Sequence, residues 1–317
     1  MLFSTSLSFN SQLQFKEERG IDKSIHIVIP IRNTSTIFFP SLYYLLKPAG
    51  IATSFDSMFR QMSLIRSFVF FAATVAATLV VQSAPPHPPV ILIDPGHGGT
   101  SVAGALEERT NSSPNNASSP GGLKEKDLTL EFSGILKEEI LKEAKRQGRS
   151  LGVMLTRESD VNLDFRTRAQ ICNRPDTACV VSIHFNATDG AKASGTLAVI
   201  AARDRNPDYE TDKRFAVGLV SACSSGVRNC LPDSKDMGII HDGHLHGGLG
   251  SNFFFQLQRQ PHLKGKPKCF LEVEFIDNPV VEKALLGAGR AEKFHAIARS
   301  VANYLVAETE EVARLRK

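Results

Sequence analysis

Short, largely apolar runs recur along the chain after residue 89, and each is bounded by glycine, proline or polar residues. The runs with the length of buried strands are residues 90–94, 152–156, 180–184, 195–201, 253–257 and 270–275. Apolar residues at the three- and four-residue spacing of amphipathic helices occupy residues 128–144, 163–172, 209–221 and 294–305. This alternation predicts an α/β fold: a single domain with a mostly parallel mixed sheet of about six strands and helices on both faces. Ligands of such folds bind at the carboxyl ends of the strands.

Two polar segments interrupt this pattern. Residues 98–122 are crowded with Ser, Asn, Pro and Gly and have no apolar period, so we expect a surface loop that could be mobile. Residues 238–248 are rich in glycine and contain His241, His244 and His246. We interpret this second segment as a flexible loop near the ligand-binding edge rather than as a second metal site.

The first third of the chain reads differently. Residues 68–81 form an uncharged stretch preceded by Arg66 and followed by small residues up to Ser83. This stretch is too short to span a bilayer comfortably, but it fits the apolar region of a signal peptide. A buried helix or an uncleaved membrane anchor is the alternative. Translation that starts at Met62 or Met58 would place the basic residue correctly for export.

These features divide the chain into four parts. We expect a mispredicted or disordered extension at residues 1–61, a signal peptide at 62–83, a proline-rich linker at 84–89 and one folded domain at 90–317. The protein is therefore predicted to be exported, to the periplasm or the extracellular space.

The composition adds few constraints. Of the 317 residues 42% are hydrophobic and 22% are charged, which is typical of globular proteins. The net charge of +4 and the lack of any long run of like charge give no reason to expect nucleic acid as a partner, although an anionic polymer would not be repelled. We expect a monomer.

Five cysteines follow the predicted cleavage site. In an oxidising compartment Cys172 with Cys179, and Cys223 with Cys230, could each close a short loop and leave Cys269 unpaired. Free buried thiols are an equally good interpretation, and the spacing matches no zinc-finger pattern.

Three residues suggest a metal site. His97 and His184 each follow or end an apolar strand, and Glu125 begins the first predicted helix. Two imidazoles and a carboxylate, with a fourth position left to water, are a ligand set that catalytic zinc uses. Each residue also has an ordinary explanation, because a strand-end histidine is often structural and acidic residues are common in first helical turns.

A hydrolytic zinc site also needs a base that is not a ligand. Residues 270–275, FLEVEF, place Glu272 and Glu274 inside an apolar strand, where an unpaired carboxylate is costly. Alternation along the strand puts both on one face, so the pattern alone does not choose between them.

Four motifs occur in order: ILIDPGHGG at residues 91–99, LKEKDL at 123–128, SIHFNA at 182–187 and LEVEFIDNP at 271–279. Together with the segments TRESD at 156–160 and RAQICN at 168–173, they resemble the zinc-dependent N-acetylmuramoyl-L-alanine amidases of the amidase-3 type. The resemblance covers most of residues 90–310.

This resemblance implies hydrolysis of the amide between N-acetylmuramic acid and L-alanine in peptidoglycan, for cell-wall remodelling or daughter-cell separation. It assigns one Zn²⁺ per chain to His97, Glu125 and His184, and the role of catalytic base to Glu272. Glu274 and Asn186 are candidates for substrate or accessory contacts. Peptidoglycan is the expected partner, an activator protein is conceivable but unidentified, and residues 90–317 become the catalytic domain.

The sequence departs from the family in three places. The loop between His97 and Glu125 is longer than expected, the aspartate that follows the Gly-Gly pair is absent, and Glu274 stands where glycine is usual. Residues 236–252 or 100–122 could cover the metal as an inhibitory segment, but neither has a helical period. We expect residues 106–119 to be dispensable for zinc binding.

Two other functions remain open. A zinc peptidase or deacylase acting on stem peptides could use the same fold and ligands, because a fold does not determine a substrate. A non-catalytic wall-binding protein with a structural metal would need a fourth protein ligand.

Overall fold

The computed structural model describes residues 87–243 and 248–314 of the chain. The predicted N-terminal extension, the signal peptide and most of the proline-rich linker lie outside these residues, as do His244 and His246. The described residues from 87 onward belong to one compact unit.

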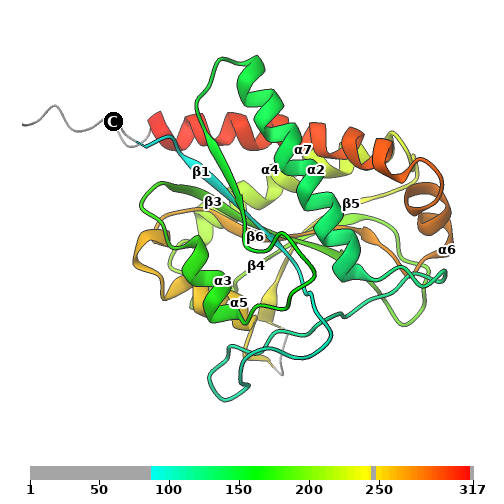
Figure 1. Ribbon diagram of the computed structural model, residues 1–317, viewed down its shortest axis with the longest axis horizontal. Coiled ribbons are helices and arrows are strands. Elements are labelled where there is room, and N and C mark those ends of the chain that lie inside the picture. The colour runs from blue at the N-terminus through cyan, green and yellow to red at the C-terminus, as the bar shows by residue number, and fades with distance from the viewer. Residues whose placement is uncertain (1–86, 244–247, 315–317) are drawn as a thin grey trace, which may run out of the picture. The chain divides into compact units, whose positions relative to one another are not determined.

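The described residues build a sheet of six strands in the order β2-β1-β3-β6-β4-β5 (Figure 1). The strands are β1 (Val90–Pro95), β2 (Gly152–Leu155), β3 (Thr177–Asn186), β4 (Thr196–Ile200), β5 (Asp236–His241) and β6 (Lys268–Phe275). Strands β2, β1, β3 and β6 are parallel, whereas β4 pairs antiparallel with β6 and parallel with β5. The predicted mostly parallel mixed sheet is therefore confirmed.

Helices cover both faces of the sheet. They are α2 (Glu125–Arg146), α3 (Phe165–Cys172), α4 (Tyr209–Arg228), α5 (Asn252–Gln258), α6 (Pro279–Val281) and α7 (Arg290–Arg314). Helices α2, α4 and α7 pack on one face, and α3 with α5 on the other (Figure 1). Short helical turns lie at Arg203–Arg205, Pro261–Leu263 and Glu282–Leu286.

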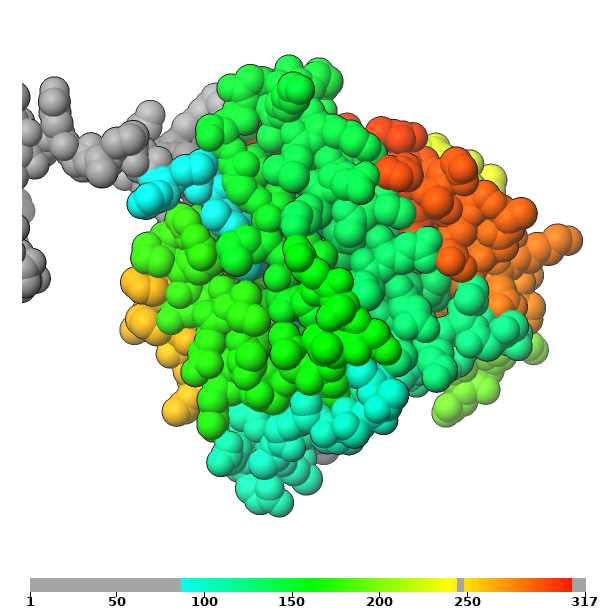
Figure 2. All heavy atoms as spheres, in the orientation of Figure 1, coloured from blue at the N-terminus to red at the C-terminus, as the bar shows by residue number. Residues whose placement is uncertain are grey.

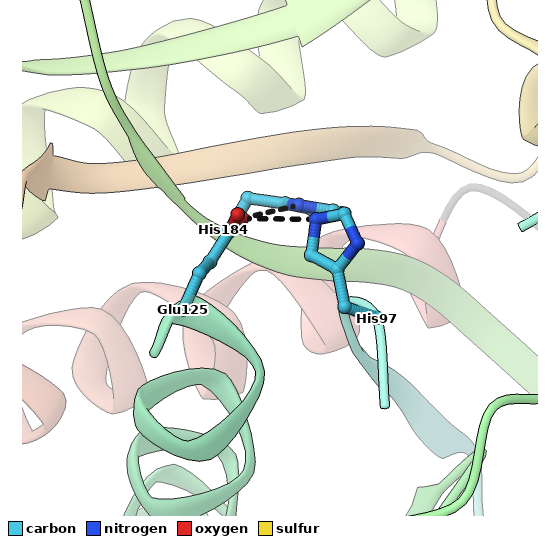
Figure 3. Close-up of side chains that lie close together, drawn as sticks. All are labelled: His97, Glu125 and His184. Atoms are coloured by element: carbon cyan, nitrogen blue, oxygen red, sulfur yellow. Dashed lines mark hydrogen bonds and ion pairs between the residues drawn. The ribbon is translucent and has the colours of Figure 1, made fainter. Parts of the chain in front are cut away.

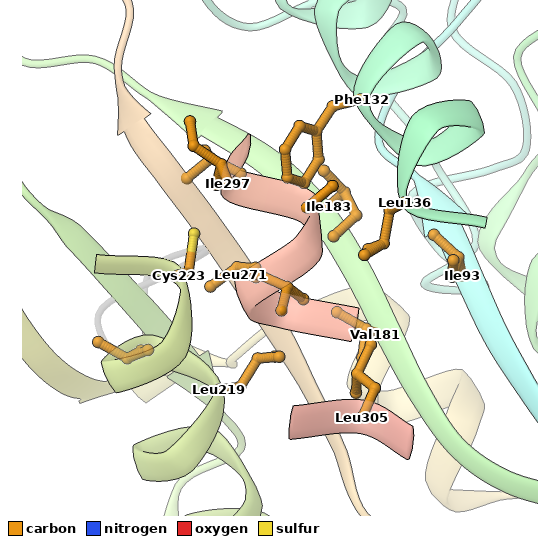
Figure 4. Close-up of a cluster of buried hydrophobic side chains, with 14 of the residues drawn as sticks. Ile93, Phe132, Leu136, Val181, Ile183, Leu219, Cys223, Leu271, Ile297 and Leu305 are labelled. Carbon is orange, nitrogen blue, oxygen red and sulfur yellow. The ribbon is translucent and has the colours of Figure 1, made fainter. Parts of the chain in front are cut away.

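Each central strand contributes to two hydrophobic clusters. In β1, Ile91 and Ile93 face α2 and α7, whereas Val90 and Leu92 face α3 and α5. Because both faces are buried, these strands have uninterrupted apolar sequences instead of an alternating pattern. Figure 4 shows the larger cluster, in which Leu271 of β6 lies among side chains from three helices.

One strand prediction is wrong. Residues 253–257 do not form a strand but belong to α5, which begins after Ser251, whose side chain accepts hydrogen bonds from Phe253 N and Phe254 N. A short apolar run suits a buried helix as well as a strand, and the Ser251 cap indicates the helix.

The glycine-rich segment is also partly mispredicted. Residues 236–241 form β5 at the edge of the sheet instead of a flexible loop. Most side chains of β5 are exposed or half-buried, so its sequence lacks the apolar pattern of a buried strand.

The cysteines are all free. Cys172 packs in the cluster beneath α3 and α5, whereas Cys179 packs in the cluster on the opposite face of the sheet. The sheet therefore separates this proposed pair. Cys223 lies in one hydrophobic cluster and Cys230 packs against the same cluster, but they form no disulfide either.

No helix within the described residues is both long and apolar enough to cross a membrane.

Candidate metal centre

The three predicted metal ligands come from three separate elements. His97 follows the end of β1, Glu125 is the first residue of α2, and His184 lies near the end of β3. One potential ligand atom from each residue lies within 4.8 Å of the other two. Figure 3 shows the Glu125 carboxylate directed at both imidazoles. The structure thus brings together the residues that the sequence motifs singled out, and the cluster could hold a metal ion.

The Glu125 carboxylate is the centre of this cluster. Its Oε1 lies 3.0 Å from Nδ1 of His184 and 3.2 Å from Nε2 of His97. Burial would raise the pKa of Glu125 above its usual 4.5, but the neighbouring His97 and His184 lower it to about 2. Burial would lower the pKa of His184, but Glu125 and Glu272 raise it. The carboxylate is therefore ionised, as a metal ligand must be.

The ring of His97 is held in one orientation from outside the cluster. Its Nδ1 lies 2.9 Å from the carbonyl oxygen of Ser113 and must donate to it. When the ring is neutral, its lone pair is therefore on Nε2, the nitrogen that faces Glu125, and this is the tautomer that binds a metal.

Gly96 makes room for the ring of His184. A Cβ atom on Gly96 would lie 2.7 Å from both ring nitrogens of His184, well inside van der Waals contact. The glycine before His97 is therefore required by the other histidine of the cluster.

A buried ion pair supports the turn that carries His97. Arg168 donates to Asp94 Oδ1 at 2.9 Å and to the carbonyl oxygen of His97 at 2.7 Å. Ser182 and Thr156 donate to the Asp94 carboxylate as well. Removing one partner of such a buried pair costs about 3–5 kcal/mol, so these residues fix the backbone around the cluster.

Arg157 also supports the backbone of the turn that follows β1. Its guanidinium donates to the carbonyl oxygens of Pro95, Gly96 and Lys126. Asp160 accepts from Gly99 N at 2.7 Å and from Lys126 Nζ at 2.6 Å. The TRESD segment thus joins the end of β1 to the first turn of α2.

The polar atoms of the cluster suit a divalent ion. Within the described part of the chain, Nε2 of His97 and Oε2 of Glu272 are buried and make no hydrogen bond. A buried polar atom without a partner is costly, and a bound ion with its water would satisfy both. Two imidazoles with one carboxylate are the donor set of catalytic zinc sites.

Glu272 and Glu274 have different surroundings. Glu272 is the β-sheet partner of His184, and burial raises its pKa from 4.5 to about 7 against the lowering effect of His184. Glu274 is buried further along, where it accepts from Gly195 N and Ser234 Oγ, each at 2.5 Å. A register shift between β3 and β6 follows the His184 pair, so simple alternation does not continue to Glu274. Only Glu272 lies beside the cluster.

The loop between His97 and Glu125 is better ordered by hydrogen bonds than its sequence predicts. It runs over the surface along one edge of the molecule in Figure 2. Besides Ser113, its Ala117 carbonyl oxygen accepts from Glu125 N at 3.0 Å. These contacts argue against the expectation that residues 106–119 are dispensable for zinc binding. The absence of apolar periodicity hid this role, because the contacts use backbone carbonyl groups.

Asn186 and His241 make hydrogen bonds of their own. Asn186 ends β3, and its Oδ1 accepts from its neighbour Ala187 N at 2.8 Å. His241 ends β5, where its Nε2 lies 3.0 Å from the hydroxyl of Tyr209. His241 does not belong to the group of potential metal ligands found among the described residues, and the role of Asn186 stays a prediction.

Comparison with known proteins supports the sequence motifs. The model of the Amidase_3 family, N-acetylmuramoyl-L-alanine amidase, matches residues 91–303. The N-acetylmuramoyl-L-alanine amidase AmiC of Neisseria meningitidis is 30% identical over 244 residues, which are 68% of this chain and 53% of that protein. The germination-specific N-acetylmuramoyl-L-alanine amidase of Bacillus subtilis is 26% identical over 212 residues, 62% of this chain and 71% of that protein. The chain thus spans about half the length of the meningococcal relative.

The fold has a counterpart among solved structures. The crystal structure of an N-acetylmuramoyl-L-alanine amidase from Clostridium difficile 630 superimposes with a TM-score of 0.52 at 20% sequence identity, and the match covers 70% of this chain and 96% of that one. This likeness confirms the α/β architecture.

Proposed function

Because the chain belongs to the Amidase_3 family, we propose that it is a zinc-dependent N-acetylmuramoyl-L-alanine amidase, which hydrolyses the amide between N-acetylmuramic acid and L-alanine in peptidoglycan. The observation that carries this proposal is the convergence of His97, Glu125 and His184 beside a carboxylate that is not part of their group. Three protein ligands leave a coordination position open, as a catalytic site requires.

Zinc, when bound, supplies a Lewis acid that polarises the substrate carbonyl and acidifies a water molecule. The protein holds the side chains of the ligands in position and in the right protonation state. Glu125 offers an ionised carboxylate, and the Ser113 carbonyl keeps the His97 lone pair on Nε2. The scaffold around Asp94 keeps the backbone of His97 rigid, which limits reorganisation during the reaction.

Glu272 serves as the general base and acid. Its carboxylate accepts a proton from the attacking water and delivers it to the departing amide nitrogen. A pKa near 7 suits both tasks, because proton transfer is most efficient when the group titrates near the working pH. The unpartnered Oε2 of Glu272 is free to accept that proton.

The proposal includes export, because peptidoglycan lies outside the cytoplasmic membrane. The apolar stretch at residues 68–81 supports a cleaved signal peptide. The exported protein should begin between Gln82 and Pro86, which N-terminal sequencing can establish. A cytoplasmic form that retains Met1 would contradict export without affecting the proposed chemistry.

Digestion of purified sacculi tests the reaction. The zinc-loaded enzyme should release intact stem peptides that begin with L-alanine, identified by mass spectrometry, and treatment with a chelator should abolish the release. Shortened stems that remain attached to glycan would identify a peptidase instead. Wall binding without any released product would identify a non-catalytic protein.

A further inference from the structure

A five-residue segment of the long loop contacts the backbone or side chains of two metal-ligand residues. At one end, the carbonyl oxygen of Ser113 accepts from Nδ1 of His97 at 2.9 Å. At the other, the carbonyl oxygen of Ala117 accepts from the backbone N of Glu125 at 3.0 Å. Between them, Pro114 O accepts from Gly98 N at 3.1 Å. Residues 113–117 therefore lie beside both the end of β1 and the start of α2.

Asn115 lies in the middle of this segment and bonds to each part of it. The side-chain Nδ2 of Asn115 donates to the backbone carbonyl oxygen of Ala117 at 2.7 Å. The backbone carbonyl oxygen of Asn115 accepts from the hydroxyl of Ser113 at 3.1 Å. Its Oδ1 accepts from the backbone N of Lys126 at 3.1 Å. One side chain thus connects the loop to the first turn of α2.

The helix needs this contact. Lys124, the residue at the N-cap position of α2, makes no capping bond with its side chain. The first backbone N–H groups of a helix have no partner inside the helix, and a capping oxygen is worth about 1 kcal/mol. Ala117 O and Asn115 Oδ1 supply these partners from the loop, for Glu125 N and Lys126 N respectively.

We propose that Asn115 is a positioning residue of the metal site, which sets His97 and Glu125 relative to one another. The inference rests on the proposed zinc-dependent function. The Asn115 amide donates to the Ala117 carbonyl that accepts from Glu125 N, and its Oδ1 accepts from Lys126 N. The side chain thus ties the first turn of α2 to the segment that begins at Ser113, whose carbonyl oxygen accepts from His97. Loss of a group that orients metal ligands typically weakens metal affinity about 10- to 100-fold.

Zinc affinity, measured by competition with a chromophoric chelator, tests the proposal without reference to hydrolysis. Asn115→Ala should bind zinc about 10- to 100-fold more weakly than the wild-type protein. The visible absorption of the cobalt-substituted protein, which reports ligand geometry, should change as well. Asn111→Ala is the matched control: Asn111 lies in the same loop, and its side chain accepts from Asn252 Nδ2 at 2.8 Å. No hydrogen bond among the described residues joins it to His97, Glu125 or His184. Its zinc affinity and cobalt spectrum should equal those of the wild type.

Asn115→Asp separates positioning from helix capping. The carboxylate still accepts from Lys126 N, so the first turn of α2 keeps its partner, but it cannot donate to Ala117 O. Zinc affinity should therefore fall although the helix cap is retained. If Asn115→Asp has the zinc affinity and cobalt spectrum of the wild type, the proposal is wrong. This test remains valid even if Asn115→Ala does not fold. An Asn115→Ala protein that melts earlier yet binds zinc normally would show a cap alone and overturn it too. A wild-type protein that binds no zinc would refute the proposed function along with this inference, whereas normal binding in all variants would refute only the inference.

Discussion

Replacing Glu272 by glutamine separates the proposed base from the proposed ligands. The amide has the shape of the carboxylate but cannot accept a proton at neutral pH. Because Glu272 is not among the three potential ligand residues, the variant should retain zinc. Its turnover should fall by roughly two to four decades, the usual contribution of a general acid–base group.

The same substitution should affect the stability of the metal-free protein. Burial raises the pKa of Glu272 from 4.5 to about 7, so the folded state favours the protonated form. That contribution to stability is present below pH 4.5 and is lost as the pH rises through 7. At about 1.4 kcal/mol for each pH unit between 4.5 and 7, ionisation costs about 3 kcal/mol of the free energy of unfolding at pH 8. Glutamine has no charge to bury, so the variant avoids this loss.

Denaturant unfolding of both metal-free proteins from pH 4 to pH 8 measures the effect. The two should have similar stability near pH 4, and Glu272→Gln should become the more stable protein by up to about 3 kcal/mol at pH 8. A difference that does not vary with pH would show that Glu272 is not buried in an ionisation-sensitive position. An active Glu272→Gln enzyme would refute the assignment of the base, and loss of zinc would show that Glu272 is a ligand.

Three further changes test the rest of the site. His97→Ala should lose zinc and activity together, because two ligands hold the ion poorly, and metal analysis of the purified variant checks this. Gly96→Ala should fold but bind zinc more weakly, since its Cβ would displace the ring of His184; an unchanged affinity in chelator competition would contradict the packing argument. Glu274→Gln should retain zinc, lose less than about tenfold in turnover and melt slightly earlier, because it replaces a carboxylate that accepts from Gly195 N. A dead, zinc-loaded Glu274→Gln enzyme would move the base to that residue.

The chain's local sequence is sufficient for the main elements and for the three candidate ligands. The buried strands β1, β3 and β6 are covered on both faces, so their apolar runs are unbroken and easily found. The same strands end at one edge of the sheet, where His97 and His184 lie, and Glu125 follows from the helix start. These features depend on residues close in sequence, which is why motifs and periodicity predict them.

Tertiary contacts decide the secondary structure of short apolar runs and of exposed strands. Residues 253–257 are apolar enough for either a strand or a helix, and packing of Phe254 against Phe270, with ring centroids 4.3 Å apart, selects a helix on the sheet face. Strand β5 has exposed side chains, so it forms because β4 offers it an edge and not because of its own pattern. The apolar pattern therefore predicts the six strands of the sheet, but it places one of them at 253–257 instead of at β5.

The chemistry of the site shows the same division. Identical residue types two positions apart, Glu272 and Glu274, differ only in what surrounds them: one pairs with His184, and the other accepts hydrogen bonds from segments that precede β4 and β5. The Ser113 carbonyl that orients His97 carries no sequence signal, because every residue has a carbonyl group. Residue types and their order thus determined which groups form the candidate site. Burial, register and backbone position, which depend on distant parts of the chain, decided the surroundings of each group.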